Sequence, residues 1–357
     1  MSAPPDHTTP VRDAHRFDEA PLEAWLNENV AVFDGPLTVR QFRGGQSNPT
    51  FWLTDGKRAY VLRKQPPGKL LPSAHAVDRE FRVMRALRDT GVPVAEMYAL
   101  CTDLAVIGTQ FYVMEHVEGR IFFDVRLQDV SREDRVVMYQ QLADVLAKIH
   151  AVDVDAAGLA DYGKHGQYVE RQVARWTQQY RATETDVIAP MEKLLAYLPA
   201  HVPADDRTTL SHGDYRLDNL IFHPTEPRVL AVLDWELSTL GHPLVDFAYN
   251  CLVWHLPPGD SRGLAGADIA ALGIPSMDDY LQGYLRRTGR SAVDVSPADW
   301  GYYLVFNMFR LVGILQGIAK RAAQGNASNP RAQQAGARAA PLADQAWALA
   351  QRIDAAR

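Results

Sequence analysis

Polar side chains that could do chemistry are concentrated in the sequence LSHGDYRLDNLIF, residues 210–222. Its middle holds one histidine, two aspartates, one arginine and one asparagine between two apolar runs. A further acid, Asp234, follows the apolar run VLAVL. Asparagine and aspartate oxygens, with no cysteine among them, favour a hard divalent cation such as Mg²⁺ over Zn²⁺. Because the coordination of Mg²⁺ is usually completed by substrate phosphates, these residues indicate a nucleotide site.

Two short apolar strands are expected to position these residues. LIFH and VLAVLDWE flank the turn PTEPR, a pattern that predicts an antiparallel hairpin. Asn219 precedes the first strand and Asp234 follows the second, so closing the hairpin brings their side chains together. Asp214 lies on the loop that leads into the first strand. The sequence therefore predicts that these three residues converge.

The arrangement H-x-D-x-x-x-x-N followed by a later aspartate is that of protein-kinase-like enzymes. The sequence resembles the aminoglycoside phosphotransferase and choline kinase branch of that fold, through HGDYRLDN at 212–219 and LDWE at 233–236. The resemblance extends over nearly the whole chain and implies ATP and Mg²⁺ as cofactors. It implies that Asp214 is the catalytic base and that Asn219 and Asp234 are the magnesium ligands.

The rest of the chain divides by pattern into a sheet-rich part and a helical part. Residues 37–64 alternate around GG and TDGKR, which predicts an antiparallel sheet. HAVDREFRVMRALRDTG predicts a helix, QFYVMEHVEG predicts a strand, and the chain beyond Gly119 is mostly helical in pattern. We expect an α+β, protein-kinase-like two-lobed fold, with a small antiparallel-sheet N-lobe that contains one main helix and a larger, mostly helical C-lobe. The expected divisions are a disordered tail at 1–16, the N-lobe at 17–117 and the C-lobe at 118–357.

By the same resemblance, the segment GGQSNPTF would cover the ATP phosphates through Gly45, Ser47 and Asn48. As a feature on its own, it would be an ordinary hairpin turn. Strand alternation places Val61 and Arg63 on one face, where Arg63 takes the place of the usual phosphate-binding lysine. Arginine can grip phosphate with two nitrogens, so the role is chemically open to it. The alternative is a solvated residue at the sheet edge.

Two further elements complete the expected nucleotide site. Glu80, on the predicted helix, would form an ion pair with the arginine, although Asp78 competes for that position. The segment MEHVEG would be the hinge, with Met114 behind the adenine and the backbone of Glu115 and Val117 at its edge. The alternative reading of MEHVEG is the end of a surface strand.

Four further residues near the central motif are candidates for the site, and three of them have two interpretations. His212 could ligate metal, but a histidine at this place more often fixes a loop through backbone hydrogen bonds. Glu236 could join a second metal ion. Asp246 resembles a buried acid that braces the catalytic loop, or it could cap the helix that follows GHPL. Arg216 would lie near the transferred phosphoryl group or point into solvent.

Composition excludes several classes of protein. The chain of 357 residues is 47% hydrophobic and 22% charged, which is ordinary for a soluble globular protein. A net charge of −6 with mixed signs gives no basic stripe, so we expect no nucleic-acid partner. Two cysteines support neither a disulfide framework nor a cysteine zinc site. The N-terminus lacks the apolar core of a signal peptide, and the longest apolar stretches suit buried helices. We therefore expect a cytoplasmic protein without membrane association, and the sequence leaves its oligomeric state open.

The expected function is an ATP-dependent phosphotransferase that moves the γ-phosphoryl group to a hydroxyl of a small molecule. A closer resemblance, to the kinase-like domains fused to acyl-CoA dehydrogenases, rests on strings such as GGQSNPTF and LDWELSTLGHPLVDFAYN. That resemblance implies a hydroxyacyl-CoA or hydroxy acid as the acceptor. An aminoglycoside-type antibiotic kinase is the alternative within the same chemistry.

Two other classes stay open at this stage. The arginine at position 63 and the weak glycine loop would suit a non-catalytic nucleotide-binding pseudokinase. A metal-dependent phosphoesterase could instead gather His212, Asp214, Asp234 and His242 around two metal ions. Magnesium-dependent ATP binding would separate the phosphoesterase from the other two classes, and phosphoryl transfer would separate the kinase from the pseudokinase.

Overall fold

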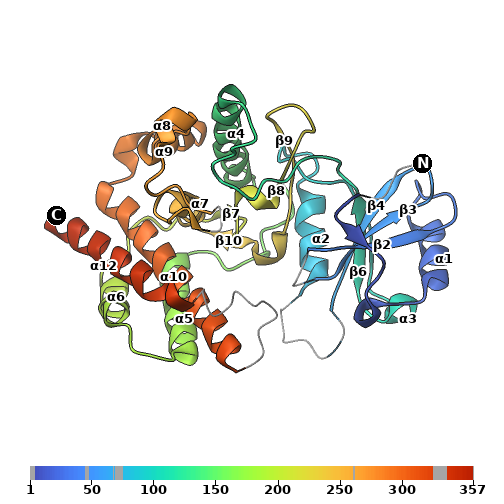
Figure 1. Ribbon diagram of the computed structural model, residues 1–357, viewed down its shortest axis with the longest axis horizontal. Coiled ribbons are helices and arrows are strands. Elements are labelled where there is room, and N and C mark those ends of the chain that lie inside the picture. Colours follow the sequence, from blue (N-terminus) through green and yellow to red (C-terminus); the bar gives the residue numbers. More distant parts are fainter. Residues whose placement is uncertain are drawn as a thin grey trace. The chain divides into compact units, whose positions relative to one another are not determined.

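The computed structural model describes residues 5–44, 48–66, 68, 75–259, 262–324 and 336–356. The chain folds into two compact units, which we call the sheet unit and the helical unit. The sheet unit comprises Met1–Ile121, Ala157–Leu159 and Asp218–Ser238, and the helical unit comprises Phe122–Ala156, Ala160–Leu217 and Thr239–Arg357. Figure 1 follows the chain through both.

The sheet unit is built on six antiparallel strands in the order β1-β2-β3-β4-β6-β5. The antiparallel sheet expected at residues 37–64 is present as three neighbouring strands joined by short connections. The strands are β1 (Thr8–Thr9), β2 (Thr38–Phe42), β3 (Thr50–Thr54), β4 (Ala59–Lys64), β5 (Met97–Cys101) and β6 (Phe111–Glu115).

The two faces of this sheet are covered by different helices (Figure 1). On one face, Phe51, Leu62 and other strand residues pack with α1 (Glu19–Asn29) in a buried core. Alternate residues point to the opposite face, where the ring of Tyr112 lies 6.3 Å from that of Phe81 on α2 (Val77–Ala86). α2 is the helix predicted from the HAVDREF segment, and the sequence analysis missed α1.

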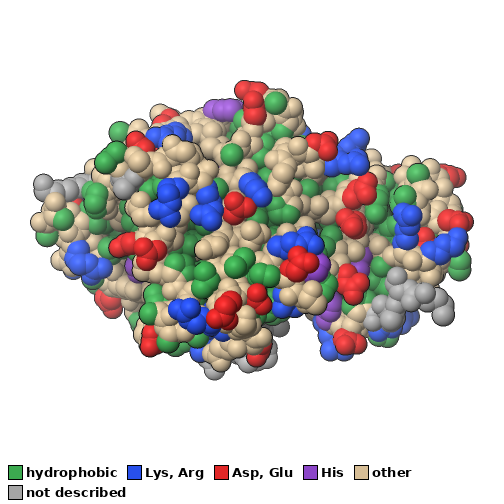
Figure 2. All heavy atoms as spheres, turned by 90° about the horizontal axis from the view of Figure 1, so that it is seen from above, with side chains coloured by type: hydrophobic (Ala, Val, Ile, Leu, Met, Phe, Trp, Pro, Cys, Tyr) green, Lys and Arg blue, Asp and Glu red, His purple; other side chains and the backbone are tan. Residues whose placement is uncertain are grey.

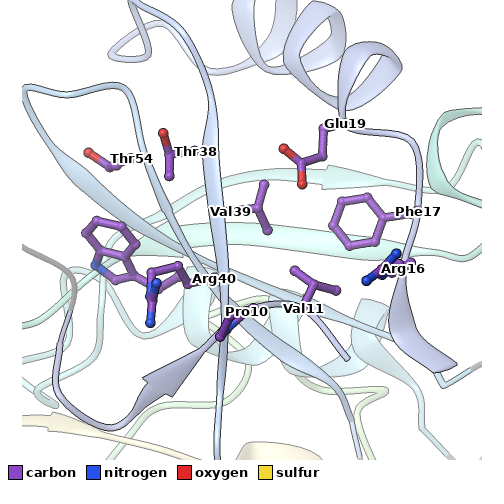
Figure 3. Close-up of a pocket in the computed structure, with 10 residues that line it drawn as sticks. Pro10, Val11, Arg16, Phe17, Glu19, Thr38, Val39, Arg40 and Thr54 are labelled. Carbon is purple, nitrogen blue, oxygen red and sulfur yellow. The ribbon is translucent and has the colours of Figure 1, made fainter. Parts of the chain in front are cut away.

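The expectation of a disordered tail at 1–16 is wrong for the part of it that the structure describes, residues 5–16. β1 pairs with the outer edge of β2 through Thr8 and Thr9, and a 3₁₀ turn follows at Asp13–His15. The edge of β2 offers backbone hydrogen bonds, which this polar segment satisfies. Because β1 reaches only Gln41 and Phe42, the remaining edge of β2 borders a pocket of about 630 Å³, lined in part by Arg16, Phe17 and Trp52 (Figure 3).

The predicted hairpin is formed by β8 (Leu220–Phe222) and β9 (Val229–Val232). It belongs to the sheet unit and not, as expected, to the helical part that begins at 118. Two reciprocal backbone hydrogen bonds of 2.8 Å join Arg120 to Phe222, and the N–H of Val232 donates to the carbonyl of Pro93 at 2.9 Å. These contacts are made by chain segments more than a hundred residues apart, so local sequence patterns carry no sign of them.

The helical unit surrounds one long central helix, α10 (Pro297–Ala323), whose first turn is capped by Ser296. By length and composition α10 could cross a membrane, but 72% of its apolar window is buried inside the protein, as in a core helix. The other described α-helices and strands of this unit are α4 (Arg132–His150), α5 (Tyr168–Thr183), α6 (Ala189–Ala200), β7 (Thr209–Ser211), β10 (Thr239–Gly241), α7 (Pro243–Asn250), α8 (Ile269–Leu272), α9 (Met277–Arg287) and α12 (Ala339–Ala355).

Candidate functional site

The hairpin brings the two expected magnesium ligands to the same end of its ladder. Leu220 pairs with Val232, and the N–H of Leu233 donates to the carbonyl of Asn219 at 2.8 Å. Asn219 therefore lies opposite Leu233, directly beside Asp234. Closure of the hairpin places the two residues together, as the sequence analysis predicted.

Asp234 has an unusual backbone conformation, with φ of 64° and ψ of 60°. This left-handed region is uncommon for a residue other than glycine, and such residues are frequent at functional sites. The conformation ends β9 and begins the 3₁₀ turn Trp235–Leu237. It also turns the carboxylate toward Arg63, whose guanidinium lies 2.7 Å from Oδ1.

Arg63 is the hub of a network of acidic side chains within the sheet unit. Its side chain is only 14% exposed and forms ion pairs with Glu80 at 3.2 Å, Asp234 at 2.7 Å and Glu236 at 3.3 Å. Burial acts against its charge, but Glu80 and the other partners outweigh this and raise the pKa of Arg63. The expected pair with Glu80 is thus present, whereas the competitor Asp78 is exposed. Lys64 is buried on the opposite face, as strand alternation requires.

Glu80 is almost fully buried and accepts hydrogen bonds from two neutral side chains. Asn48 Nδ2 donates to it at 2.9 Å and the Tyr112 hydroxyl at 3.1 Å. Burial raises the pKa of Glu80 to about 7, in spite of the attraction of Arg63. Asn48 is 0% exposed, so its side chain supports Glu80 and does not face a phosphate site, contrary to the expectation. Gly45 and Ser47 lie outside the described residues.

Two of the residues expected around adenine, Val61 and Met114, lie on the Arg63 face of the sheet. Val61 pairs directly with Met114 on β6 and with Trp52 on β3, which makes a continuous apolar row across three strands. The N–H of Glu115 donates a hydrogen bond to the carbonyl of Glu96 at 2.8 Å, so this donor already has a partner within the protein. Val117 follows the strand and is half-buried.

In the helical unit, Asp214 is held by three neighbouring groups. The Tyr249 hydroxyl donates to Oδ1 at 2.6 Å, and Arg216 Nε lies 3.2 Å from the same oxygen. The Asp214 N–H donates to Nδ1 of His212 at 3.3 Å. His212 is fully buried and fixes the loop, in line with the second of its two interpretations. The sequence analysis did not single out Tyr249.

Asp246 braces the same loop from α7. Its carboxylate accepts the N–H groups of His212 at 2.7 Å and of Gly213 at 2.9 Å, and His150 Nε2 lies 3.2 Å away. Burial alone would raise the pKa of Asp246, but the bonds from His150 and the loop hold it below its usual value. The capping alternative is wrong, because Asp246 lies inside α7 and His242 is the N-cap.

The described residues do not assemble the phosphoesterase cluster. No group of three or more His, Cys, Asp or Glu side chains that could hold a metal ion occurs among them. His242 instead stacks on Tyr303 and lies 3.5 Å from Asp205. Asn219 and Asp234, with Glu236 nearby, supply the hard oxygen donors that suit Mg²⁺, an ion that needs few protein ligands when phosphates and water complete its shell.

A family model described as the phosphotransferase enzyme family matches residues 38–286. The chain belongs to this phosphotransferase family. Its kinase-like fold agrees with solved structures. A candidate aminoglycoside phosphotransferase of Ralstonia eutropha is 52% identical, covers 94% of this chain and 99% of its own, and has a TM-score of 0.87. Aminoglycoside phosphotransferase APH(4)-Ia, solved with ADP and hygromycin B, shares the fold at 16% identity, 92% and 99% coverage and a TM-score of 0.60.

The chain is also similar to parts of longer proteins. Acyl-CoA dehydrogenase family member 10 of Mus musculus is 46% identical over 96% of this chain and 32% of its own length. Family member 11 of Homo sapiens is 43% identical over 89% of the chain and 41% of its own. Probable acyl-CoA dehydrogenase IBR3 of Arabidopsis thaliana is 42% identical, over 96% and 44%. The chain thus spans less than half the length of these relatives.

Proposed function

We propose that the protein is an ATP-dependent kinase that transfers the γ-phosphoryl group to a hydroxyl of a small molecule. The proposal rests on the fixed position of the Asp214 carboxylate. Tyr249 and Arg216 contact this carboxylate, and Asp246 braces the loop that carries it. Such a preset carboxylate is what a kinase requires, because its catalysis consists mainly of positioning and charge stabilisation. The family supports ATP as the donor.

In this mechanism Asp214 orients the acceptor hydroxyl and accepts its proton as the oxygen–phosphorus bond forms and the bond to the leaving ADP breaks. Asn219 and Asp234 would hold Mg²⁺, with Glu236 available to a second ion. When bound, the ion neutralises charge on the phosphates. The left-handed backbone of Asp234 supports this role. A strained conformation persists only where the surrounding structure holds it, and such residues are concentrated at functional sites.

The other candidate residues take roles around the nucleotide. Arg63 supplies a fixed positive charge beside Asp234, and Glu80 keeps that charge in place. Val61 and Met114 form an apolar surface for adenine, with the backbone of Glu115 and Val117 at its edge. The loop residues Gly45 and Ser47 cover the phosphates, and Arg216 lies near the transferred group.

For the acceptor we propose a hydroxyacyl-CoA or a hydroxy acid. Two cations lie close to Asp214: Arg216 pairs with its carboxylate, and Arg310 donates to the carbonyl of Gly213 at 2.9 Å. Cations at this place suit an anionic acceptor and oppose a polycationic aminoglycoside. The names of the acyl-CoA dehydrogenase relatives support the same class. Because the similar protein of Ralstonia eutropha is described as a candidate aminoglycoside phosphotransferase, aminoglycosides are also included among the acceptors to be tested.

The pseudokinase is the alternative of another class, and a specific contact favours it. Arg63 is committed to three carboxylates, one of them the proposed magnesium ligand Asp234, so a nucleotide complex must rearrange part of this network. The presence of Asp214, Asn219 and Asp234 argues against a pseudokinase, because these are the groups that phosphoryl transfer needs.

The test is ADP release from Mg²⁺-ATP over a panel of 4-hydroxyacyl-CoAs, free hydroxy acids, aminoglycosides, choline and sugars. Asp214→Asn is the inactive variant, and Asp186→Asn makes the same change on an exposed loop. We expect one acceptor class to stimulate turnover, with a loss of about 100-fold or more in Asp214→Asn only. Magnesium-dependent ATP binding without stimulated turnover would favour the pseudokinase, and absence of ATP binding would refute the nucleotide site.

A further inference from the structure

We propose that Tyr249 is a positioning residue for Asp214, and that Arg310 in turn holds Tyr249. The inference rests on the proposed function, because it concerns how the proposed catalytic base is oriented. The sequence analysis assigned no role to either residue, and both lie in the helical unit with Asp214. The contacts that join them form a single chain from α10 to the loop.

The contact between Tyr249 and Asp214 has the geometry of a strong hydrogen bond. The phenol oxygen lies 2.6 Å from Oδ1, within the range of a charge-assisted O–H···O⁻ bond. Burial, and next the charge of Asp214, raise the pKa of Tyr249, so the phenol remains the donor at neutral pH. A donor at one carboxylate oxygen restricts rotation of the whole carboxylate, and so fixes where its other oxygen points.

The position of Tyr249 on α7 explains why this contact is rigid. Asp246 and Tyr249 are three residues apart, so both side chains leave the helix on the same face. Asp246 binds the backbone of the loop at His212 and Gly213, while Tyr249 binds the side chain at Asp214. One buried helix therefore sets both the path of the loop and the orientation of its carboxylate.

Arg310, on α10, holds the other side of the tyrosine. Its guanidinium carbon lies 4.7 Å from the centre of the Tyr249 ring and 5.3 Å from that of Trp176 on α5. It also donates to the carbonyl of Gly213 at 2.9 Å. A cation between two aromatic faces is favourable on both sides. Arg310 thus ties the ring of Tyr249 to the residue that precedes Asp214.

The experiment compares Tyr249→Phe with Tyr302→Phe, which also removes a phenol, one that donates to the carbonyl of Leu198 within the same unit. Melting temperature, Mg²⁺-ATP affinity, acceptor KM and kcat are measured for both. We expect kcat of Tyr249→Phe to fall by about 10- to 100-fold, as for a misplaced catalytic group, with ATP affinity unchanged and a melting temperature close to that of the control. Equal kcat values in the two variants would overturn the proposal.

Two further variants separate positioning from folding. In the Asp214→Asn background, Tyr249→Phe should have no further effect on kcat, because the group that it orients is already lost. Arg310→Met should lower kcat less than Tyr249→Phe, and the double variant should lose less than the product of the two effects. A full additional loss in the Asp214→Asn background would show that Tyr249 acts elsewhere and would refute the inference.

The inference can also be judged if the wild type phosphorylates none of the acceptors, which would count against the proposed function alone. In that case, crystal structures of the wild type and of Tyr249→Phe are compared. A rotated Asp214 carboxylate in the variant would support the positioning role. An unchanged carboxylate would overturn it.

Discussion

At the residue scale, Arg63 illustrates what a sequence can and cannot say. Strand alternation places residue 63 on the face of Val61 and Lys64 on the other, which agrees with the structure. The choice between Glu80 and Asp78 as the partner of Arg63 stayed open in the sequence, and the structure shows Glu80. The contacts of Arg63 with the hairpin acids could not be read from the sequence, because 171 positions separate it from Asp234. Asn48 was misread for a similar reason: a polar residue in a glycine-rich loop looks like a ligand contact until the buried Glu80 is seen beside it.

Removal of the Arg63 guanidinium is expected to destabilise the protein. Arg63→Met would leave Glu80, which is 1% exposed, without its cation. A buried charge without a partner costs about 3 kcal/mol or more of unfolding free energy. Lys57→Met removes an exposed ion pair with Asp34 and is the matched control, for which we expect a much smaller loss. Denaturant unfolding of both variants measures the difference, and equal losses would contradict the account of the network.

Tyr249 was missed although a signal for it exists. A tyrosine three positions after an acid that braces a loop faces the same loop on a helix. Sequence reasoning weighed Asp246 without following its helix face to Tyr249. The contact of Tyr249 with Asp214 therefore escaped prediction because it required the orientation of the helix to be known.

At the element scale, the hairpin β8–β9 was predicted from its two apolar runs and its turn, whereas its attachment to the sheet unit was not. The attachment depends on close backbone contact between residues 119–120 and Phe222. A Cβ at Gly119 would lie 2.3 Å from the carbonyl oxygen of Phe222 and 2.4 Å from Ile221 Cγ2. Only glycine fits there without a shift of the hairpin.

Gly119→Ala is therefore expected to lower the free energy of unfolding by about 1–3 kcal/mol, the usual cost of overpacking. Gly259→Ala, at a position where a Cβ meets nothing within 4 Å, is the control. Thermal and denaturant unfolding of the two variants provide the measurement. A stable Gly119→Ala protein would mean that the hairpin is seated differently from the structure.

A second element-scale prediction concerns the contact between Asp205 and the N-cap residue of α7, His242. The hydrogen bond with His242 is the main reason that the pKa of Asp205 is lowered to about 2. A carboxyl whose pKa is lower in the folded state stabilises the fold above its unfolded pKa and loses that effect as the pH falls toward the folded value. The contribution should therefore be full at pH 7 and diminish between about pH 4 and pH 2.

We expect Asp205→Asn to be less stable than the wild type at pH 7 and the stability difference to shrink at pH 3. Denaturant unfolding at the two pH values measures this. Asp186→Asn, on an exposed loop, should show little difference at either pH. If the stability difference between the wild type and Asp205→Asn is the same at both pH values, the ion pair with His242 does not contribute to the stability of the fold.

At the scale of the whole molecule, the resemblance through HGDYRLDN and LDWE implied the kinase-like fold. The change of periodicity near Gly119 predicted the order of the sheet-rich and helical parts. The boundary predicted at residue 118 assigned the hairpin to the helical part, whereas the hairpin belongs to the sheet unit. The sequence analysis also missed α1 and α6, because it did not examine their apolar residues. Acidic and basic side chains are interspersed on the face seen in Figure 2.

The central claim is that this chain forms a phosphate monoester on the hydroxyl of a small molecule. The most direct test is ³¹P NMR of the protein with ATP, Mg²⁺ and a 4-hydroxyacyl-CoA, with Asp214→Asn in parallel. The account predicts a new monoester resonance that grows in equal amount with ADP and is absent for the variant. ATP that stays intact, or that yields only inorganic phosphate, with this and every other acceptor of the panel would contradict it.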